Sequence, residues 1–207
     1  MATTRFIILR HGETVWNRED RYQGHLDSPL TVAGLAQARA LAQRLQGCRF
    51  SALYSSDLGR ARQTAQLIAD QTGHRLQLDP RLRERHLGWF QGLIKAEIRQ
   101  KFPDEYRLFK SGNPDYVVPG GESGRERFAC VLACLEELAL RHGGERLVVV
   151  THGGVLGALV RHTLGLPLQA PRRFSRFNGS WNLFSFERGN WFLDTWGDVS
   201  HLAEGPG

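Results

Sequence analysis

The sequence of 207 residues has few cysteines, few lysines and no long apolar run. Its three cysteines are an odd number, and the apolar run near the N-terminus spans only four residues, too short for the apolar region of a signal peptide. Both features are typical of a protein in a reducing compartment, so we expect a cytoplasmic location. No apolar stretch approaches the length needed to cross a bilayer, so we expect no membrane partner.

The sequence also lacks a recognisable metal-binding pattern. Cys130 and Cys134 lie four apart, but no further ligand follows them at short spacing. We therefore interpret them as a buried apolar pair on one helix face, and we predict no metal and no other cofactor.

Lysine is scarce although the chain is basic. The formal net charge is +6, from 27 basic and 21 acidic residues, and only three of the basic residues are lysines. The arginines are spread along the chain, and no basic run with interleaved aromatic residues is present, so nucleic acid is not the expected partner. A small anionic substrate explains positive charge equally well.

The apolar pattern that is present predicts an α/β fold. Short apolar runs, typical of buried parallel strands, alternate with amphipathic helices, and two aromatic-rich runs around a Gly-Asn turn end the chain. The expected strands are 6–9, 52–55, 76–78 and 147–150, followed by a hairpin of 181–187 and 191–196. The expected helices are 31–47, 57–73, 95–101, 104–110, 123–142 and 155–164.

This order predicts a three-layer helix-sheet-helix sandwich whose sheet is mostly parallel, with an antiparallel hairpin at the C-terminus. We find no repeat and no linker, so residues 1–207 are expected to form a single domain. Residues 93–118 are expected to form a lid-like insertion over one end of the sheet. The aromatic hairpin is a candidate surface for a homodimer, or it simply closes the sheet.

Two predicted strands end in the same way, each with a histidine followed by glycine. The first strand leads into Arg10-His11-Gly12, and the strand at 147–150 leads into Thr151-His152-Gly153. The carboxyl ends of parallel strands face one crevice, so neighbouring strands would bring His11 and His152 together. Two further strands lead to Arg60 and Arg62 and to Glu84.

These residue types suit phosphate chemistry. Arginine binds phosphate oxygens in bidentate fashion, which assigns Arg10 and Arg62 to one phosphoryl group. A neutral His11 can attack phosphorus and form a phosphohistidine, while His152 donates to the charge of the transition state. Glu84 can donate a proton to the leaving alkoxide. We interpret Arg60 as a salt-bridge residue, because it faces elsewhere on the helix.

The segment Leu9-Arg10-His11-Gly12-Glu13-Thr14-Val15-Trp16-Asn17 resembles the signature of the histidine phosphatase superfamily, in its phosphoglycerate-mutase-like branch. The similarity continues in order through 21–24, 55–65, 82–84, 120–123 and 150–153, nearly the whole chain. It implies that His11 is the nucleophile, Glu84 the general acid and base, and Arg10, Arg62 and His152 the phosphate pocket. It also implies phosphate-contacting or orienting roles for Asn17, Gln23, Gly24 and Gly153, and a structural role for Glu122.

Three functions remain open from the sequence. The leading hypothesis is a metal-independent phosphomonoester phosphatase that forms a phosphohistidine from a small phosphorylated metabolite. The second is a cofactor-dependent phosphoglycerate mutase, because Lys95 stands where the resemblance implies a substrate-binding lysine. The third is a non-catalytic module that binds a phosphorylated ligand, which has no need of the nucleophile His11. Trp89 either packs or lines an apolar rim for the substrate, and His86 either lines the pocket or packs.

Overall fold

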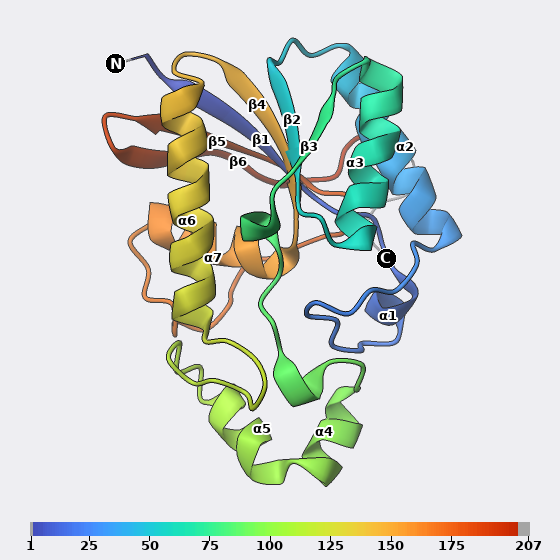
Figure 1. The fold of residues 1–207 in the computed structure, drawn as a ribbon, viewed down its shortest axis with the longest axis vertical. Helices are drawn as coiled ribbons and strands as arrows, with labels where there is room; N and C mark the ends of the chain where they lie inside the picture. Colours follow the sequence, from blue (N-terminus) through green and yellow to red (C-terminus); the bar gives the residue numbers. More distant parts are fainter. Residues whose placement is uncertain (1, 203–207) are drawn as a thin grey trace.

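A computed structural model describes residues 2–202, and its centre is a six-stranded sheet (Figure 1). The strands are β1 (Thr4–Arg10), β2 (Ala52–Ser55), β3 (Leu76–Leu78), β4 (Arg146–Thr151), β5 (Trp181–Glu187) and β6 (Asn190–Asp198). Their order across the sheet is β3-β2-β4-β1-β5-β6. The first four strands run parallel, whereas β5 pairs antiparallel with both β1 and β6. The mostly parallel sheet with an antiparallel hairpin is confirmed.

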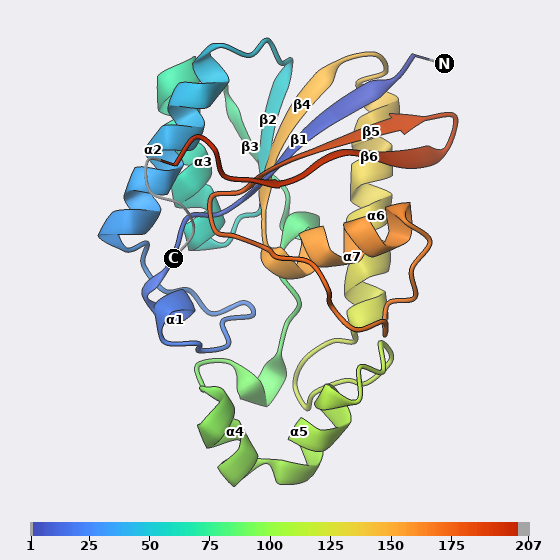
Figure 2. The same ribbon diagram turned by 180° about the vertical axis from the view of Figure 1, so that it is seen from behind.

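Helices cover both faces of the sheet, as Figures 1 and 2 show from opposite sides. They are α1 (Val15–Arg18), α2 (Val32–Gln46), α3 (Gly59–Thr72), α4 (Lys95–Lys101), α5 (Pro103–Lys110), α6 (Gly124–Arg141) and α7 (Gly153–Thr163). Alternate residues of β1 point to opposite faces: Ile7 and Leu9 pack with α2 and α3, and Phe6 and Ile8 with α6 and α7. The predicted three layers are therefore confirmed.

The expected helix starts agree with the structure to within two residues; α3 begins two residues later than expected and α7 two residues earlier. Thr31 caps α2 and Ser123 caps α6, each through its side-chain oxygen. Asp57, at the expected start of α3, does not cap the helix but pairs with Arg83. The carboxylate of Asp27, from a distant loop, accepts the first N–H groups of α3, with 2.7 Å from Gly59 N to Oδ2.

The segment 93–118 contains α4 and α5 and extends beyond the end of the sheet at which β1, β2 and β4 finish (Figure 1). It packs around a small apolar cluster of its own, which includes Phe90, Ile98 and Tyr106. Its role as a lid stays a prediction. None of the helices in residues 2–202 combines the length and the apolar character needed to span a membrane.

Candidate active site

The register of the sheet brings the two predicted histidines together. β1 and β4 are parallel neighbours in which Arg10 pairs with Thr151, so His11 and His152 follow at the same level. Their ring centroids lie 5.2 Å apart, and both residues are buried. The expectation that these strand ends bring the two histidines together is confirmed, but only His11 lines the adjacent cavity, and His152 is fully buried beside it.

His11 is held as a neutral imidazole. Its Nδ1 lies 2.8 Å from the carbonyl oxygen of Gly12 and donates to it, which leaves the lone pair on Nε2. Burial lowers the pKa of His11 well below its usual value, and the charges of Arg60 and Arg10 lower it further. The unprotonated Nε2 is therefore available as a nucleophile at neutral pH.

Close backbone packing fixes the loop that carries His11. A Cβ on Gly12 would lie 2.3 Å from the carbonyl oxygen of Gly34, so only glycine permits the loop to rest against the start of α2. The Gly12 amide donates to Thr64 Oγ1 on α3 at 3.1 Å. His11 thus lies on a loop anchored to two helices.

His152 has one ring nitrogen with a hydrogen-bond partner and one without. Its Nε2 is hydrogen bonded to Ser56 Oγ at 2.8 Å, whereas the buried Nδ1 has no partner within residues 2–202. Burial, followed by the charges of Arg60 and His11, lowers the pKa of His152 well below its usual value. A neutral imidazole with an unpaired Nδ1 next to His11 can hydrogen bond to a phosphoryl group.

Arg10 and Glu84 reach the same cavity, which has a volume of about 500 Å³ and is also lined by His11. Burial lowers the pKa of Arg10 to about 10, so its guanidinium is still charged at neutral pH. The carboxylate of Glu84 accepts the amide of Gly154 at 2.8 Å and that of Arg85 at 3.0 Å. The cavity therefore holds a neutral imidazole, a fixed positive charge and a carboxyl group.

Comparison with known proteins agrees with this geometry. The profile of the histidine phosphatase superfamily (branch 1) matches residues 6–199. The chain belongs to this superfamily. The expected family and enzyme class are thereby confirmed.

Individual relatives align over almost all of the chain. Phosphoglycerate mutase-like protein 4 of Arabidopsis thaliana is 43% identical over 96% of this chain and 86% of its own. A metal-independent phosphoserine phosphatase of the same plant is 41% identical over 97% and 84%. The solved structure of a mycobacterial glucosyl-3-phosphoglycerate phosphatase with VO3 is 35% identical, covers 94% of this chain and 99% of that one, and superimposes with a TM-score of 0.84.

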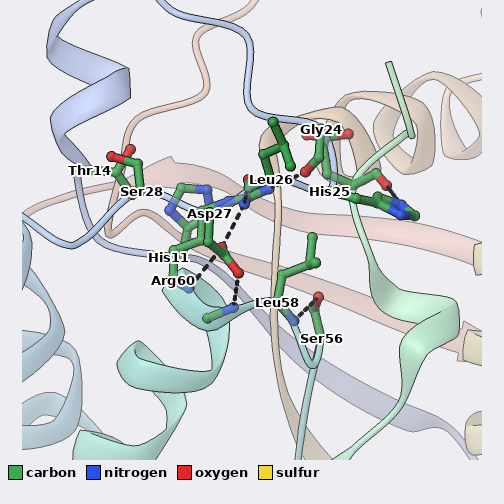
Figure 3. A network of polar contacts seen from close by, with 12 residues as sticks. His11, Thr14, Gly24, His25, Leu26, Asp27, Ser28, Ser56, Leu58 and Arg60 are labelled. Atoms are coloured by element: carbon green, nitrogen blue, oxygen red, sulfur yellow. Dashed lines mark hydrogen bonds and ion pairs between the residues drawn. The ribbon is translucent and has the colours of Figure 1, made fainter. Parts of the chain in front are cut away.

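The placement of Arg62 in the pocket of this histidine phosphatase is wrong, because Arg60 and not Arg62 lines the cavity. Arg62 is exposed on α3, whereas the side chain of Arg60 is 1% exposed and lines the cavity. Arg60 donates to the carbonyls of Gly24 (2.8 Å) and Leu26 (3.0 Å) and pairs with Asp27 at 2.9 Å (Figure 3). Side chains two residues apart on a helix point in directions that differ by about 200°, so only one of the two arginines can face the site.

Four of the six predicted substrate-binding residues line the cavity; they are Asn17, Gln23, Gly24 and Gly153. Lys95 and Trp89 do not, and these two placements are wrong. Lys95 is exposed at the start of α4, with Nζ 3.6 Å from Asp20. Trp89 is half exposed and packs on Phe102, with ring centroids 5.2 Å apart.

His86 packs rather than lining the cavity. Its ring meets that of His25 edge-on, with centroids 4.7 Å apart. Its backbone amide donates to Glu122 Oε1 at 2.7 Å, which agrees with a structural role for Glu122. No group of three or more metal-binding side chains occurs within residues 2–202.

Sequence reasoning missed several residues, which come from the loop before β5, from α6 and α7, and from the loops around Arg21 and Arg85. Asn178 donates to the carbonyl of His11 and to Oδ1 of Asn17, both at 3.1 Å, so it connects the nucleophile loop to α1. Further arginines line the cavity; they are Arg21, Arg85, Arg127, Arg161 and Arg176. The cluster of arginines at 172–176 was a possible signal, but nothing in a loop sequence indicates its direction.

Proposed function

We propose that this histidine phosphatase hydrolyses phosphomonoesters of small metabolites through a phosphohistidine on His11. The observation that carries the proposal is the neutral His11, with Nδ1 anchored and Nε2 unprotonated, in one cavity with Arg10, Arg60 and Glu84. The relatives named as phosphatases, one of them metal-independent, support the same activity.

In the first step, Arg10, Arg60 and the unpaired Nδ1 of His152 bind the phosphoryl oxygens. Nε2 of His11 forms the bond to phosphorus while the ester P–O bond breaks and its electron pair goes to the leaving oxygen. Glu84, in its acid form, gives that oxygen its proton, and the alcohol departs.

In the second step, water attacks the phosphohistidine. Glu84, now a carboxylate, takes a proton from the water as the new P–O bond forms. The P–N bond breaks, its electron pair returns to Nε2 of His11, and inorganic phosphate is released. Charge on phosphorus is neutralised throughout by the guanidinium groups of Arg10 and Arg60.

A phosphoglycerate mutase is the second candidate, favoured by the name of the 43% identical plant relative. Lys95, the residue that favoured a mutase in the sequence, lies outside the cavity. The lining of the cavity also contains no lysine among residues 2–202. We therefore place transfer to water ahead of transfer to a second alcohol.

The test compares the wild type with His11→Ala, using His162→Ala as the control because His162 is an exposed histidine of α7. Each protein is incubated in chelator with 4-nitrophenyl phosphate, and separately with 3-phosphoglycerate plus 2,3-bisphosphoglycerate. We expect phosphate release by the wild type and the control, none by His11→Ala, and a phosphohistidine at position 11 by acid-free mass spectrometry. Efficient isomerisation with little phosphate release would make the mutase the correct assignment, and no turnover would favour a binding module. The expected cytoplasmic location and the homodimer remain predictions.

A further inference from the structure

The cavity holds more positive charge than one phosphoryl group requires. Its lining includes a single acidic residue, Glu84, and seven arginines, which are Arg10, Arg21, Arg60, Arg85, Arg127, Arg161 and Arg176. Arg60 is balanced by Asp27, Arg127 by Glu122, and Arg21 by two glutamates outside the cavity. A phosphoryl group at His11 would occupy Arg10, so several guanidinium groups are left without a counterion.

Arg161 and Arg176 are the most exceptional of these. Neither has a carboxylate within 4.0 Å among residues 2–202, and the buried Nε of each has no hydrogen-bond partner there. Both arginines are half-buried, so part of each guanidinium has lost water without gaining an opposite charge, which is unfavourable. In agreement, burial is the main cause that lowers the pKa of each.

The two guanidinium groups converge on one glycine of α7. A Cβ on Gly157 would lie 3.2 Å from Nη1 of Arg176 and 3.5 Å from Nη1 of Arg161. Backbone carbonyls hold them there: Arg176 donates to Gly153 at 2.7 Å, and Arg161 to Gly157 at 2.8 Å and Ala170 at 3.1 Å. Two like charges are thus fixed side by side by neutral acceptors, which leaves their attraction for an anion intact.

The pair lies next to the phosphoryl site but is distinct from it. The guanidinium of Arg10 donates to the backbone carbonyl of Arg176 and lies against Gly153, at the start of α7. Gly157 is one helical turn further along, a rise of about 5–6 Å. The charges that lower the pKa of His11 are those of Arg60 and Arg10, so the Arg161 end is the more distant one.

We propose that the substrate carries a second anionic group, a carboxylate or a second phosphate, which binds to Arg161 and Arg176 while its phosphomonoester sits at His11. This inference rests on the proposed phosphatase function and specifies its substrate class. Apolar side chains from α6, α7 and the following loop, Phe128, Val131, Ala158 and Leu168, line the same cavity and suit a short carbon skeleton between the two anionic groups.

The experiment compares the hydrolysis of ω-carboxyalkyl phosphates with that of their uncharged amides, over skeletons of two to six carbons. A second series compares alkanediol bisphosphates with the monophosphates, which distinguishes a carboxylate from a phosphate as the second group. We expect kcat/KM to favour the charged member by about ten- to a hundredfold at the best length, the effect of one or two charge-assisted hydrogen bonds. Equal kcat/KM for charged and uncharged members at every length would overturn the inference and leave the phosphatase function standing.

Arg161→Gln should reduce this preference at least about tenfold, and Arg161→Lys should retain part of it. Arg39→Gln is the matched control, because Arg39 is an exposed arginine of α2 and its loss changes the net charge equally. An unchanged preference in Arg161→Gln would contradict the assignment.

A binding measurement keeps the two proposals separate. Calorimetry with a non-hydrolysable ω-carboxyalkyl phosphonate and its amide reports the second-anion site even if no ester is turned over. Tighter binding of the charged phosphonate to the wild type, without hydrolysis of any ester, would sustain the site and refute the phosphatase. Equal binding of both phosphonates to the wild type would refute the site. This outcome needs only the wild-type protein, so it decides the question even if Arg161→Gln fails to fold.

Discussion

Gly154 is the position at which one added methyl group should disable the general acid. A Cβ there would lie 2.0 Å from Oε1 of Glu84, and real Cβ atoms approach no neighbour within 3.0 Å. In Gly154→Ala the carboxyl group must therefore withdraw by about 1 Å and lose its hydrogen bond to the amide of residue 154. A displacement of that size lowers a catalytic rate by about 10²-fold.

The leaving group determines how much of this loss is visible. An alkyl phosphate needs a proton on its leaving oxygen, whereas 4-nitrophenolate leaves without one. We expect Gly154→Ala to slow alcohol release from an alkyl phosphate by about 10²-fold, with a change of only a few-fold for 4-nitrophenyl phosphate. Single-turnover release of the alcohol is the measurement, because it reports P–O cleavage before Glu84 acts as base.

Gly47→Ala is the control, since Gly47 has φ −81° at the end of α2 and a Cβ there meets nothing closer than 3.8 Å. It should behave as the wild type with both substrates. An equal loss for both esters in Gly154→Ala would show general damage to the site, and full activity on the alkyl ester would refute the role of Glu84.

Three further results are expected. Arg60→Lys should lower kcat/KM for any phosphomonoester by about 10²-fold or more, the effect of a lost bidentate guanidinium contact, whereas Arg62→Lys should match the wild type in the same assay. Burial lowers the pKa values of His11 and His152 below 6.5, so the folded protein favours their neutral forms. Their contribution to the free energy of unfolding is complete above about pH 6.5, and it falls as the pH drops through the lowered pKa values. Thermal melts from pH 7.5 to 4.5 should show this decline, and it should be smaller in His152→Asn; an identical decline would contradict it. Asp27→Ala removes the cap of α3 and the partner of Arg60, so chemical denaturation should show a loss of at least about 1 kcal/mol, and an unchanged midpoint would argue against both contacts.

The sequence predicted the parts of the fold and site that depend on local pattern. The strand ends at His11 and His152 were found because each apolar run is followed directly by histidine and glycine, and parallel pairing then fixes their level. Glu84 reached the cavity as expected. Arg60 was correctly interpreted as a salt-bridge residue, because it pairs with Asp27, but its place in the cavity was not foreseen. The directions of Arg60 and Arg62 depend on where α3 begins, and the cap that sets this point comes from Asp27, more than thirty residues away in the chain. Such a contact leaves no periodic signal.

The glycines of α7 show why the charged groups around the site were the hardest to foresee. In the sequence, only Gly153 was singled out, by resemblance; nothing distinguished Gly154 and Gly157, and glycine weakens a helix. In the structure, a Cβ on these three glycines would meet Arg10, Glu84 and Arg176 respectively. These glycines lower the intrinsic stability of the helix, but they let three charged side chains lie against its backbone. The spacing along α7 then sets the distance between the phosphoryl site and the arginine pair. Gly154→Ala and Gly157→Ala should therefore impair different properties. The first should impair proton transfer, and the second should impair recognition of the second anionic group.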